Sequence, residues 1–459
     1  MTNKLTLKFE LLNPPAGNFD KTNPPLGLVV GLDRENIGNF VIPEETRFRF
    51  SQLVDNIFHY YHHIQTNDEN IVNIESIDCT NNSNYIIPVA VAYHPNDWTD
   101  LIDGKPTDTS SIFELINPIF LKDLQTGRAM LLIDQSVEGY HTDWLWSWFH
   151  DKCKKYSISP QAIIYVTGDQ SSLDNYTQWS VDNNISVKLN IIPSVTLSMY
   201  IYQTYMRENL NINFDRVLEH KSTNADNLYL YDCTNSRPRP QRVYNYLHLK
   251  NAELIEDGNI SIGNHPDWKT KLTNDQLNKY QLPPDIDTII LPQNIDNVIP
   301  IVNGTDQYWK FVERILDNVY LNSWVSLITE SSYFKHEGSV FISEKTFKPI
   351  ACMQPFIIVG SKHSLKYIKK LGYKTFDGFI DESYDDLEDE DRFLAIIRAV
   401  NQIKAIADKP AWYKSMKEIL EYNHNLFMEI GTKKSTEHKF VDKYYFEYFK
   451  DKNVQDSLR

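Results

Sequence analysis

One stretch of the chain, residues 320–360, constrains the fold more than any other. It contains an apolar, β-branched run at 324–329, followed by a polar loop that begins at Glu330. Ser343 then opens a short helical pattern, and a second apolar run covers 355–359. The order strand, loop, helix, strand predicts a βαβ unit of a parallel sheet. In such open sheets, ligands bind beyond the carboxyl ends of the strands, near helix N-termini.

Charged residues fall at this predicted edge. Glu330 ends the first strand, and Glu344 with Lys345 begins the helix. A cation beside free backbone N–H groups suits a phosphate, whereas an ionised carboxylate only accepts hydrogen bonds and suits sugar hydroxyls. A capped helix with a surface ion pair would show the same Glu-Lys dipeptide. The Glu344-Lys345 pair therefore indicates a ligand site only in combination with the predicted βαβ unit that contains it.

The same unit resembles the C-terminal nucleotide-sugar motif of fucosyltransferase-like GT-B glycosyltransferases. That motif reads roughly F-E-N-S, a loop, Y-x-T-E-K, a helix and V-P-V-V-x-G. The matching segments are Glu330-Ser331, 342–345 and 354–360. The chain departs from the motif at Ser331, where the family has Asn, and at 341–342, near the family Tyr. The resemblance implies that Glu344 holds the ribose of a nucleotide, that Lys345 holds its phosphates, and that Glu330 lies near the donor sugar or shapes its pocket.

A second basic segment follows the predicted strand at 227–232. It runs from Asn235 through Arg237 and Arg239 to Arg242, with prolines at 238 and 240 that stiffen the turn. Arginine binds phosphate through a planar fork, which suits a diphosphate. The form N-x-R-P-R-x-x-R resembles related bacterial and phage glycosyltransferases, in which this region contacts the donor phosphates. The resemblance implies donor-binding roles for Asn235, Arg239 and Arg242, while Arg237 is expected to be a surface charge. A solvated basic loop is the alternative.

Elsewhere, apolar runs alternate with amphipathic segments, which predicts parallel sheets with helices on their faces. The expected strands are 5–12, 26–32, 84–94, 129–134, 162–169, 185–192, 227–232, 259–263, 288–292, 324–329, 355–359 and 373–376. The expected helices are 47–65, 144–156, 176–183, 243–250, 306–317, 364–370, 392–407 and 414–428. We predict a first domain at 1–218, a polar linker at 219–226, a second domain at 227–430, and a tail at 431–459 that packs back on the first domain.

Composition narrows the classes of protein that fit. The 459 residues are long enough for more than one domain, and the formal net charge of −15 disfavours nucleic acid as a default partner. Cys79, Cys153, Cys233 and Cys352 are scattered, which argues for a reducing compartment, and we expect the cytoplasm of a bacterium or of an infected host cell. No run approaches the roughly 18 apolar residues of a membrane span.

Two patterns bear on metal binding. His59, His62 and His63 have helical spacing, but no other usual ligands lie nearby in the sequence. The D-x-D pattern at 285–287 precedes its predicted strand, so it falls at the wrong edge for a metal-dependent transferase and is expected to form a turn. We therefore expect no metal and no cofactor other than a nucleotide-sugar co-substrate.

Together these expectations describe an α/β protein of the GT-B type, with two Rossmann-like domains facing each other across a cleft. The family implies a metal-independent, inverting hexosyl- or deoxyhexosyltransferase that moves a sugar to an acceptor hydroxyl of a glycan or surface polysaccharide. A base in the first domain would take the acceptor proton, with Glu138 the first choice and Asp134 and His141 behind it. Asp169 ends the next predicted strand, at 162–169, and is therefore expected at the same edge of the sheet as Asp134.

Other functions fit the same patterns. The chain could be a phage enzyme that glycosylates a hydroxylated DNA base, although its acidity disfavours DNA. It could also be a non-catalytic module that binds a sugar or nucleotide on a GT-B scaffold.

Overall fold

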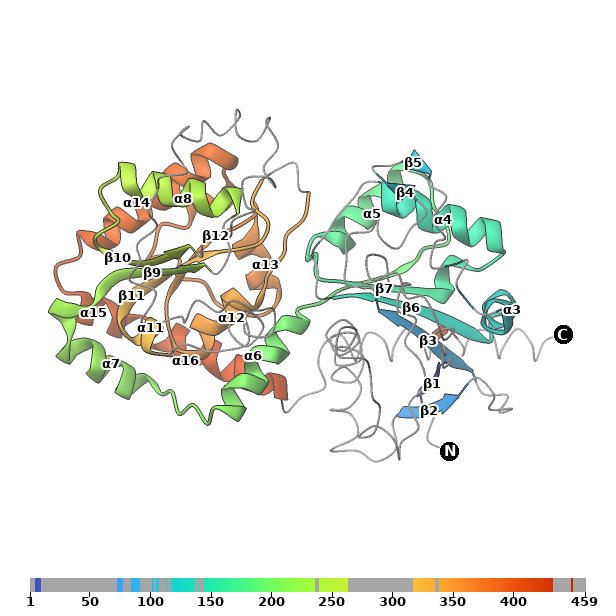
Figure 1. Cartoon of the computed structure of the whole chain (residues 1–459), viewed down its shortest axis with the longest axis horizontal. Helices are drawn as coiled ribbons and strands as arrows, with labels where there is room; N and C mark the ends of the chain where they lie inside the picture. The colour runs from blue at the N-terminus through green and yellow to red at the C-terminus, as the bar shows by residue number, and fades with distance from the viewer. Residues whose placement is uncertain are drawn as a thin grey trace, which may run out of the picture. The chain divides into compact units, whose positions relative to one another are not determined.

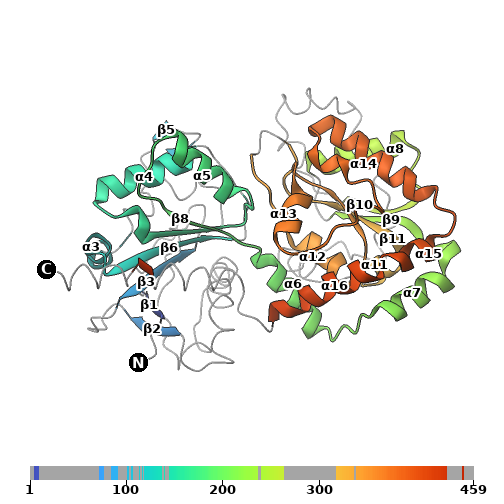
Figure 2. The same cartoon turned by 180° about the vertical axis from the view of Figure 1, so that it is seen from behind.

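The fold is α/β and contains two separate compact units (Figures 1 and 2). Unit 1 comprises residues 1–196 and 433–459, and unit 2 comprises residues 197–432. The computed structural model describes residues 5–9, 72–76, 84–90, 101–102, 105–106, 113, 116, 118–136, 139, 144–235, 239–262, 317–334, 338–431 and 447–448. The expected strands at 26–32 and 288–292 and the expected helix at 47–65 lie outside these residues, as do residues 306–316 of the expected helix at 306–317.

Unit 1 is built on a parallel sheet whose described strands have the order β2-β1-β3-β6-β7-β8. These strands are β1 (Leu5–Phe9), β2 (Val72–Ser76), β3 (Tyr85–Ala90), β6 (Ala129–Gln135), β7 (Ile163–Thr167) and β8 (Asn190–Pro193). A small antiparallel pair joins β4 (Leu101–Ile102) to β5 (Lys105–Pro106). The described helices are α3 (Pro118–Thr126), α4 (Trp144–Tyr156), α5 (Ser172–Asp182) and the short η2 (Pro160–Ala162).

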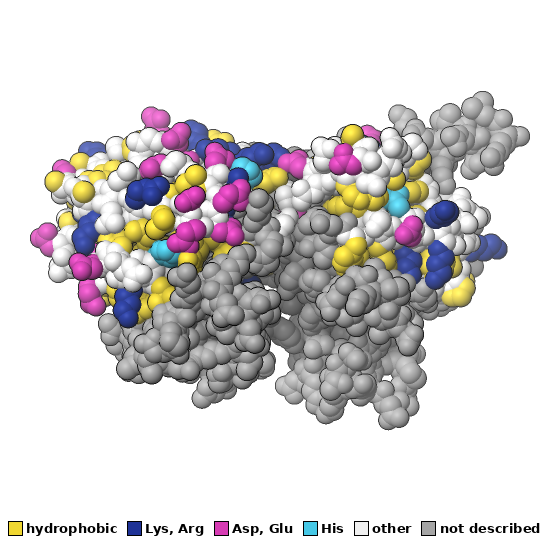
Figure 3. Space-filling view, turned by 90° about the horizontal axis from the view of Figure 1, so that it is seen from above, with side chains coloured by type: hydrophobic (Ala, Val, Ile, Leu, Met, Phe, Trp, Pro, Cys, Tyr) yellow, Lys and Arg dark blue, Asp and Glu magenta, His cyan; other side chains and the backbone are white. Residues whose placement is uncertain are grey.

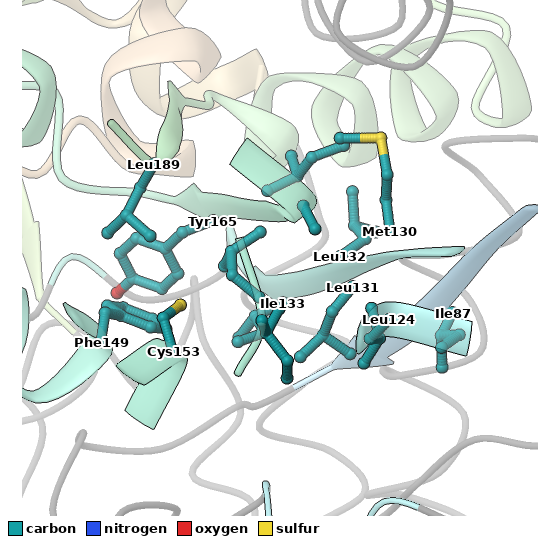
Figure 4. Packing of buried hydrophobic residues seen from close by; sticks show 14 of the residues in the cluster. Ile87, Leu124, Met130, Leu131, Leu132, Ile133, Phe149, Cys153, Tyr165 and Leu189 are labelled. Carbon is teal, nitrogen blue, oxygen red and sulfur yellow. The ribbon is translucent and has the colours of Figure 1, made fainter. Parts of the chain in front are cut away.

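The core of unit 1 lies around β6, in which every residue is buried. Figure 4 shows that successive side chains of β6 point to opposite faces of the sheet, with Leu131 and Ile133 on one face and Met130 and Leu132 on the other. A parallel sheet covered on both faces requires this continuous apolar run. Tyr448, from the C-terminal segment, is buried in the same cluster.

Unit 2 contains a second parallel sheet with the described order β10-β9-β11-β12. Its strands are β9 (Tyr229–Asn235), β10 (Gly258–Ile262), β11 (Ser323–Thr329) and β12 (Phe356–Val359). Helices α8 and α14 lie on one side of this sheet, and α7, α11, α12 and α16 lie on the other, as both views show (Figures 1 and 2).

The helices of unit 2 follow the strands in alternation. The described α-helices are α6 (Thr196–Arg207), α7 (Phe214–Thr223), α8 (Pro240–Asn251), α11 (Asp317–Leu321), α12 (Glu344–Ala351), α13 (Ser364–Lys370), α14 (Asp389–Lys404), α15 (Lys409–Ser415) and α16 (Lys417–Met428). Helix α6 starts one residue before the unit. Three short helices, η3 (Ala225–Asn227), η7 (Ser383–Asp386) and η8 (Glu429–Gly431), lie between or after them.

The predicted linker at 219–226 is wrong, because these residues belong to α7, to η3 and to the single residue that joins them. Asn213 caps α7 by accepting a hydrogen bond from the Arg216 amide at 3.0 Å. The buried positions of α7 are Phe214, Val217 and Lys221, which have helical spacing. A lysine at a core position hid the helical periodicity from the sequence pattern.

Other differences are smaller. The expected strand at 185–192 is reduced to β8, and the expected helix at 414–428 is divided at Met416 into α15 and α16. Residues 373–376 form no strand, and the only regular pairing nearby in the described chain is an isolated bridge between Asp377 and Ile380.

Candidate functional site

The chain changes direction in the sheet of unit 2 at β9. From β9 it continues to β10 on one side and then returns to β11 on the other side. In open α/β sheets, ligands bind at such a switch point, outside the carboxyl ends of the two strands between which the order reverses. We call the end of the sheet formed by the last residues of β9, β11 and β12 the carboxyl edge of unit 2.

Asn235 lies at this switch point. It is the last residue of β9 and is buried, and its side-chain oxygen accepts a hydrogen bond from the hydroxyl of Thr329, the last residue of β11. Its backbone amide donates to the Ser261 hydroxyl of β10 at 2.8 Å. The Asn235 side chain therefore joins neighbouring strand ends, and its contacts are internal to the sheet.

The N-terminus of α8 meets the end of β11. Arg239 is the N-cap residue, is exposed, and donates from Nη1 to the Ser331 carbonyl at 3.2 Å. Gln241 is buried and donates from Nε2 to the carbonyls of Glu330 and Ser331, at 3.0 and 2.8 Å. Gln241 was not among the residues singled out from sequence. A glutamine in the first turn of a helix carries no pattern that distinguishes it from a solvated residue.

The two predicted arginines differ in their surroundings. Arg239 is exposed at the carboxyl edge, whereas Arg242 is only 4% exposed and lies near the Cys233 thiol. Burial raises the pKa of Cys233 to about 12, and the Arg242 charge only partly opposes this rise. Of the two, Arg239 is therefore the one available to an incoming anion without rearrangement. Arg237 lies outside the described residues.

Glu330 anchors the start of α12. Its carboxylate is fully buried and accepts hydrogen bonds from the Ser343 amide at 3.0 Å, the Ser343 hydroxyl at 2.5 Å and the Thr346 hydroxyl at 2.7 Å. Ser343 is the N-cap residue, and its hydroxyl oxygen in turn accepts from the Lys345 amide at 3.3 Å. A carboxylate at a helix N-terminus is favoured by the backbone dipoles. Both oxygens of Glu330 are thus used to orient α12.

Glu344 and Lys345 form an ion pair in the first turn of α12. The Lys345 ammonium lies 2.8 Å from Glu344 Oε1 and 3.0 Å from the Ser343 hydroxyl oxygen. Burial tends to raise the pKa of Glu344, but the positive charges of Lys345 and Lys348 outweigh it and hold the pKa at about 2. Burial lowers the pKa of Lys348 to about 8, with Glu344 opposing that shift. Glu344 is therefore ionised at neutral pH.

These contacts connect most of the predicted donor residues. Arg239 contacts Ser331, the adjacent Glu330 contacts Ser343, and Ser343 contacts Lys345. The first turns of α8 and α12 both point their backbone N–H groups toward the carboxyl edge, because each helix follows a strand that ends there. Glu344 already compensates the Lys345 ammonium, so an anionic ligand at this edge would meet the backbone N–H groups of α12 beside a cation that is paired in the free protein.

Gly360, directly after β12, fits this edge only because it has no side chain. A Cβ atom there would lie 2.9 Å from both Ile358 Cγ2 and Ser364 Oγ, and 3.4 Å from Glu330 Cβ. Close packing against Ile358 and Ser364 therefore explains the glycine that ends the predicted motif.

The base candidates belong to unit 1. Asp134 lies near the end of β6 as predicted, is buried, and accepts a hydrogen bond from the Ser136 amide at 2.9 Å. Burial raises its pKa, and the hydrogen bonds from Ser136 oppose the rise. Asp169 similarly accepts from the amide and hydroxyl of Ser171. Glu138 and His141 lie outside the described residues.

Within the described parts of the chain, no group of His, Cys, Asp or Glu side chains has an arrangement that could hold a metal ion. His59, His62, His63 and the 285–287 segment lie outside those parts. Among the described helices, none is both long and apolar enough to cross a membrane.

Comparison of the chain with protein-family models, curated proteins and solved structures gave no match.

Proposed function

We propose that the protein is a glycosyltransferase that uses a nucleotide-sugar donor, with the donor bound at the carboxyl edge of unit 2. The observation that carries the proposal is the switch point between β9 and β11. Asn235, Arg239 and the anchored start of α12 all lie at this one edge. The resemblance of segments 330–331 and 342–345 to a nucleotide-sugar motif supports the same interpretation.

The charges at this edge suit a leaving diphosphate. Arg239 offers an exposed guanidinium, and Lys345 offers a partly exposed ammonium at the N-terminus of α12. Cations and backbone N–H groups aimed at a departing anion lower the barrier because they stabilise charge that develops in the transition state. Glu330 contributes indirectly, since it fixes where the N–H groups of α12 point.

The proposed reaction is a direct displacement with inversion. The acceptor oxygen forms a bond to the anomeric carbon while the bond from that carbon to the diphosphate oxygen breaks. A base takes the acceptor proton, and the diphosphate leaves with the bonding electrons. Asp134, Glu138 and His141 of unit 1 are the candidates for this base. Burial raises the pKa of Asp134, which makes its carboxylate a stronger base. In the proposed GT-B arrangement, unit 1 binds the acceptor.

The alternative acceptor, a hydroxylated base in DNA, is disfavoured by the formal net charge of −15. On the face seen in Figure 3, acidic side chains lie among many of the Lys and Arg side chains of the described residues. Binding to the DNA backbone relies on clustered cations. A glycan or another small hydroxyl acceptor is therefore the better candidate.

A thermal-shift screen of GDP-, UDP-, ADP- and TDP-linked sugars, with the free diphosphates alongside, tests the proposal. A ligand at about 100 times its Kd adds roughly 2.7 kcal/mol to the stability of the protein. We expect one nucleotide to stabilise the wild type, and Arg239→Ala and Lys345→Ala to lose that effect. Arg398→Ala and Lys414→Ala, at exposed positions on α14 and α15, are the matched controls.

The screen, followed by an assay of sugar transfer and hydrolysis with the stabilising donor, separates the alternatives. If no nucleotide stabilises the protein, the proposed donor site is wrong. If one binds tightly but the sugar is neither transferred nor hydrolysed under any acceptor condition, the chain is a binding module rather than an enzyme.

A further inference from the structure

Arg392 is buried to an unusual degree for an arginine. It lies in the first turn of α14, and its side chain is only 1% exposed. An arginine stays ionised in proteins, so burial of its charge costs free energy unless that charge is compensated. Replacing a buried ion with an apolar residue of similar volume is often neutral or stabilising. Stability alone therefore does not account for an arginine at this position.

The guanidinium of Arg392 holds the loop that follows β11. Nη2 donates to the Tyr333 carbonyl at 2.6 Å, and Nη1 donates to the Leu387 carbonyl at 3.0 Å. The guanidinium carbon also lies 4.2 Å from the centre of the Tyr333 ring, and the carboxylate of Asp389 is 3.3 Å from Nη2. A planar fork that bonds the Tyr333 carbonyl and packs on the Tyr333 ring at once restricts the backbone and the side chain of that residue together.

Tyr333 is fixed from other directions as well. Its ring stacks on Phe393 with centres 4.1 Å apart, and its hydroxyl donates to the Asp389 carbonyl at 2.7 Å. Tyr333 is fully buried. The backbone two residues earlier, at Ser331, is thereby held close to the sheet.

Ser331 is where this network meets the carboxyl edge. Its carbonyl accepts hydrogen bonds from Gln241 and from Arg239, the exposed cation at the start of α8. A displacement of Tyr333 would move the Ser331 carbonyl and release the Arg239 side chain. Arg392 thus reaches Arg239 through the backbone of residues 331–333.

We propose that Arg392 is a positioning residue for the carboxyl edge of unit 2, which holds Ser331 so that Arg239 is preorganised for the phosphates of the ligand. The link to phosphate binding rests on the proposed function, whereas the mechanical link from Arg392 to Arg239 does not. Preorganisation acts on affinity because the free protein then loses less conformational freedom when the ligand binds.

Hydrogen exchange on the full-length protein, without ligand, tests the mechanical link. In Arg392→Met, amide exchange should rise in peptides covering 331–334 and also in those covering 239–242. Arg398→Met, at an exposed position on the same helix, is the control and should change neither. Arg392→Lys keeps the cation but lacks the fork, and should give an intermediate effect if Arg392→Met does not fold.

A double-mutant cycle tests the link to the ligand. The probe is the nucleoside diphosphate that stabilises the wild type most. Arg392→Met should raise its Kd about tenfold, the effect expected when one charge-assisted hydrogen bond is lost. In the Arg239→Ala background the same change should have little further effect, because the residue it positions is gone.

The outcomes distinguish the two proposals. The inference is wrong, and Arg392 is only a structural residue, if exchange rises at 331–334 but not at 239–242. It is also wrong if the effects of Arg392→Met and Arg239→Ala on the binding free energy are fully additive. If exchange rises at both segments and the wild type binds no nucleoside diphosphate, the positioning role stands while the proposed function fails.

Discussion

The Glu330 carboxylate accepts hydrogen bonds from both the backbone amide and the hydroxyl of Ser343, so the end of β11 and the start of α12 are joined by one side chain. This relationship places the first turn of α12 at the carboxyl edge. It also explains why a carboxylate that looks like a ligand in the sequence is fully buried in the structure.

Glu330→Gln should destabilise unit 2 by about 2 kcal/mol, the range of a lost hydrogen bond to a charged group. The amide would present an N–H₂ group to donors on Ser343 or Thr346, leaving a buried donor unsatisfied. Chemical denaturation followed by hydrogen exchange of peptides from 197–432 measures the change. Glu418→Gln, at an exposed position on α16, is the control and should shift stability by less than about 0.5 kcal/mol. Equal effects of the two substitutions would contradict the anchoring role of Glu330.

The two arginines at the start of α8 should respond differently to truncation. Arg239→Ala should leave the stability within about 0.5 kcal/mol of wild type, because the side chain is exposed. It should weaken nucleotide binding by roughly tenfold or more, because a phosphate loses a charged donor. Arg242→Ala should lower the melting temperature measurably, because it removes a buried side chain. Calorimetry of unfolding and of binding separates the two effects. A large loss of stability in Arg239→Ala would show that its main role is structural.

Lys221 should give unit 2 a particular pH dependence. Its ammonium is fully buried and donates to the carbonyls of Tyr320 and Ser323. Burial lowers its pKa to about 7, against 10.5 in an exposed lysine, and the charge of Asp232 opposes this only in part. Between these values the unfolded chain binds the proton that the folded chain has lost, so the contribution of Lys221 to stability increases as pH rises from about 7 to 10.5.

The measurement compares wild type with Lys221→Met across that pH range. The difference in unfolding free energy, wild type minus variant, should grow by a few kcal/mol between about pH 7 and pH 10, on the scale of 1.4 kcal/mol per unit of pKa shift. Lys414→Met, at an exposed position on α15, is the control. A constant difference would mean that Lys221 titrates in the folded protein as it does in the unfolded chain.

Two glycines in the C-terminal half of unit 2 offer a comparison of steric and backbone effects. Gly360→Ala should destabilise by about 1–3 kcal/mol, because the new methyl group would lie 2.9 Å from Ile358 and Ser364 atoms. Gly378 has a φ of +87°, and a methyl group there would meet no atom within 4 Å. Gly378→Ala should therefore cost only about 1 kcal/mol, from backbone conformation alone. Urea denaturation of both variants measures the difference. If Gly378→Ala proves the more costly, the packing of Ile358 and Ser364 around Gly360 is looser than the distances indicate.

The regular elements of this fold are visible in the sequence where the residue pattern is strong. The helices at 144–156 and 364–370 have the predicted bounds, and the strands β6, β9, β11 and β12 fall within a few residues of their predicted positions. Each has either a continuous apolar run or a helical period with polar residues on the other face, so local sequence is sufficient.

The missed features depend on contacts between distant residues. Helix α7 buries Lys221, whose partners on and around β11 lie about a hundred positions away, so its core face looked polar in the sequence. Gln241 and Ser331 are 90 positions apart, and Arg392 and Tyr333 are 59 apart. No local pattern records these pairings. The sequence therefore predicted where the charged residues lie along the strands, but not which of them are buried in internal contacts and which stay exposed.

Because Glu330 holds Ser343 directly, hydrogen bonds from the end of β11 fix where α12 begins, whatever the length of the chain between these two residues. Loop-closure entropy changes slowly with length, by about 0.6 kcal/mol for each doubling. The start of α12 therefore depends on the contacts of Glu330 and on the buried Val340, Phe341 and Ile342 that precede it, more than on the number of residues in the connection.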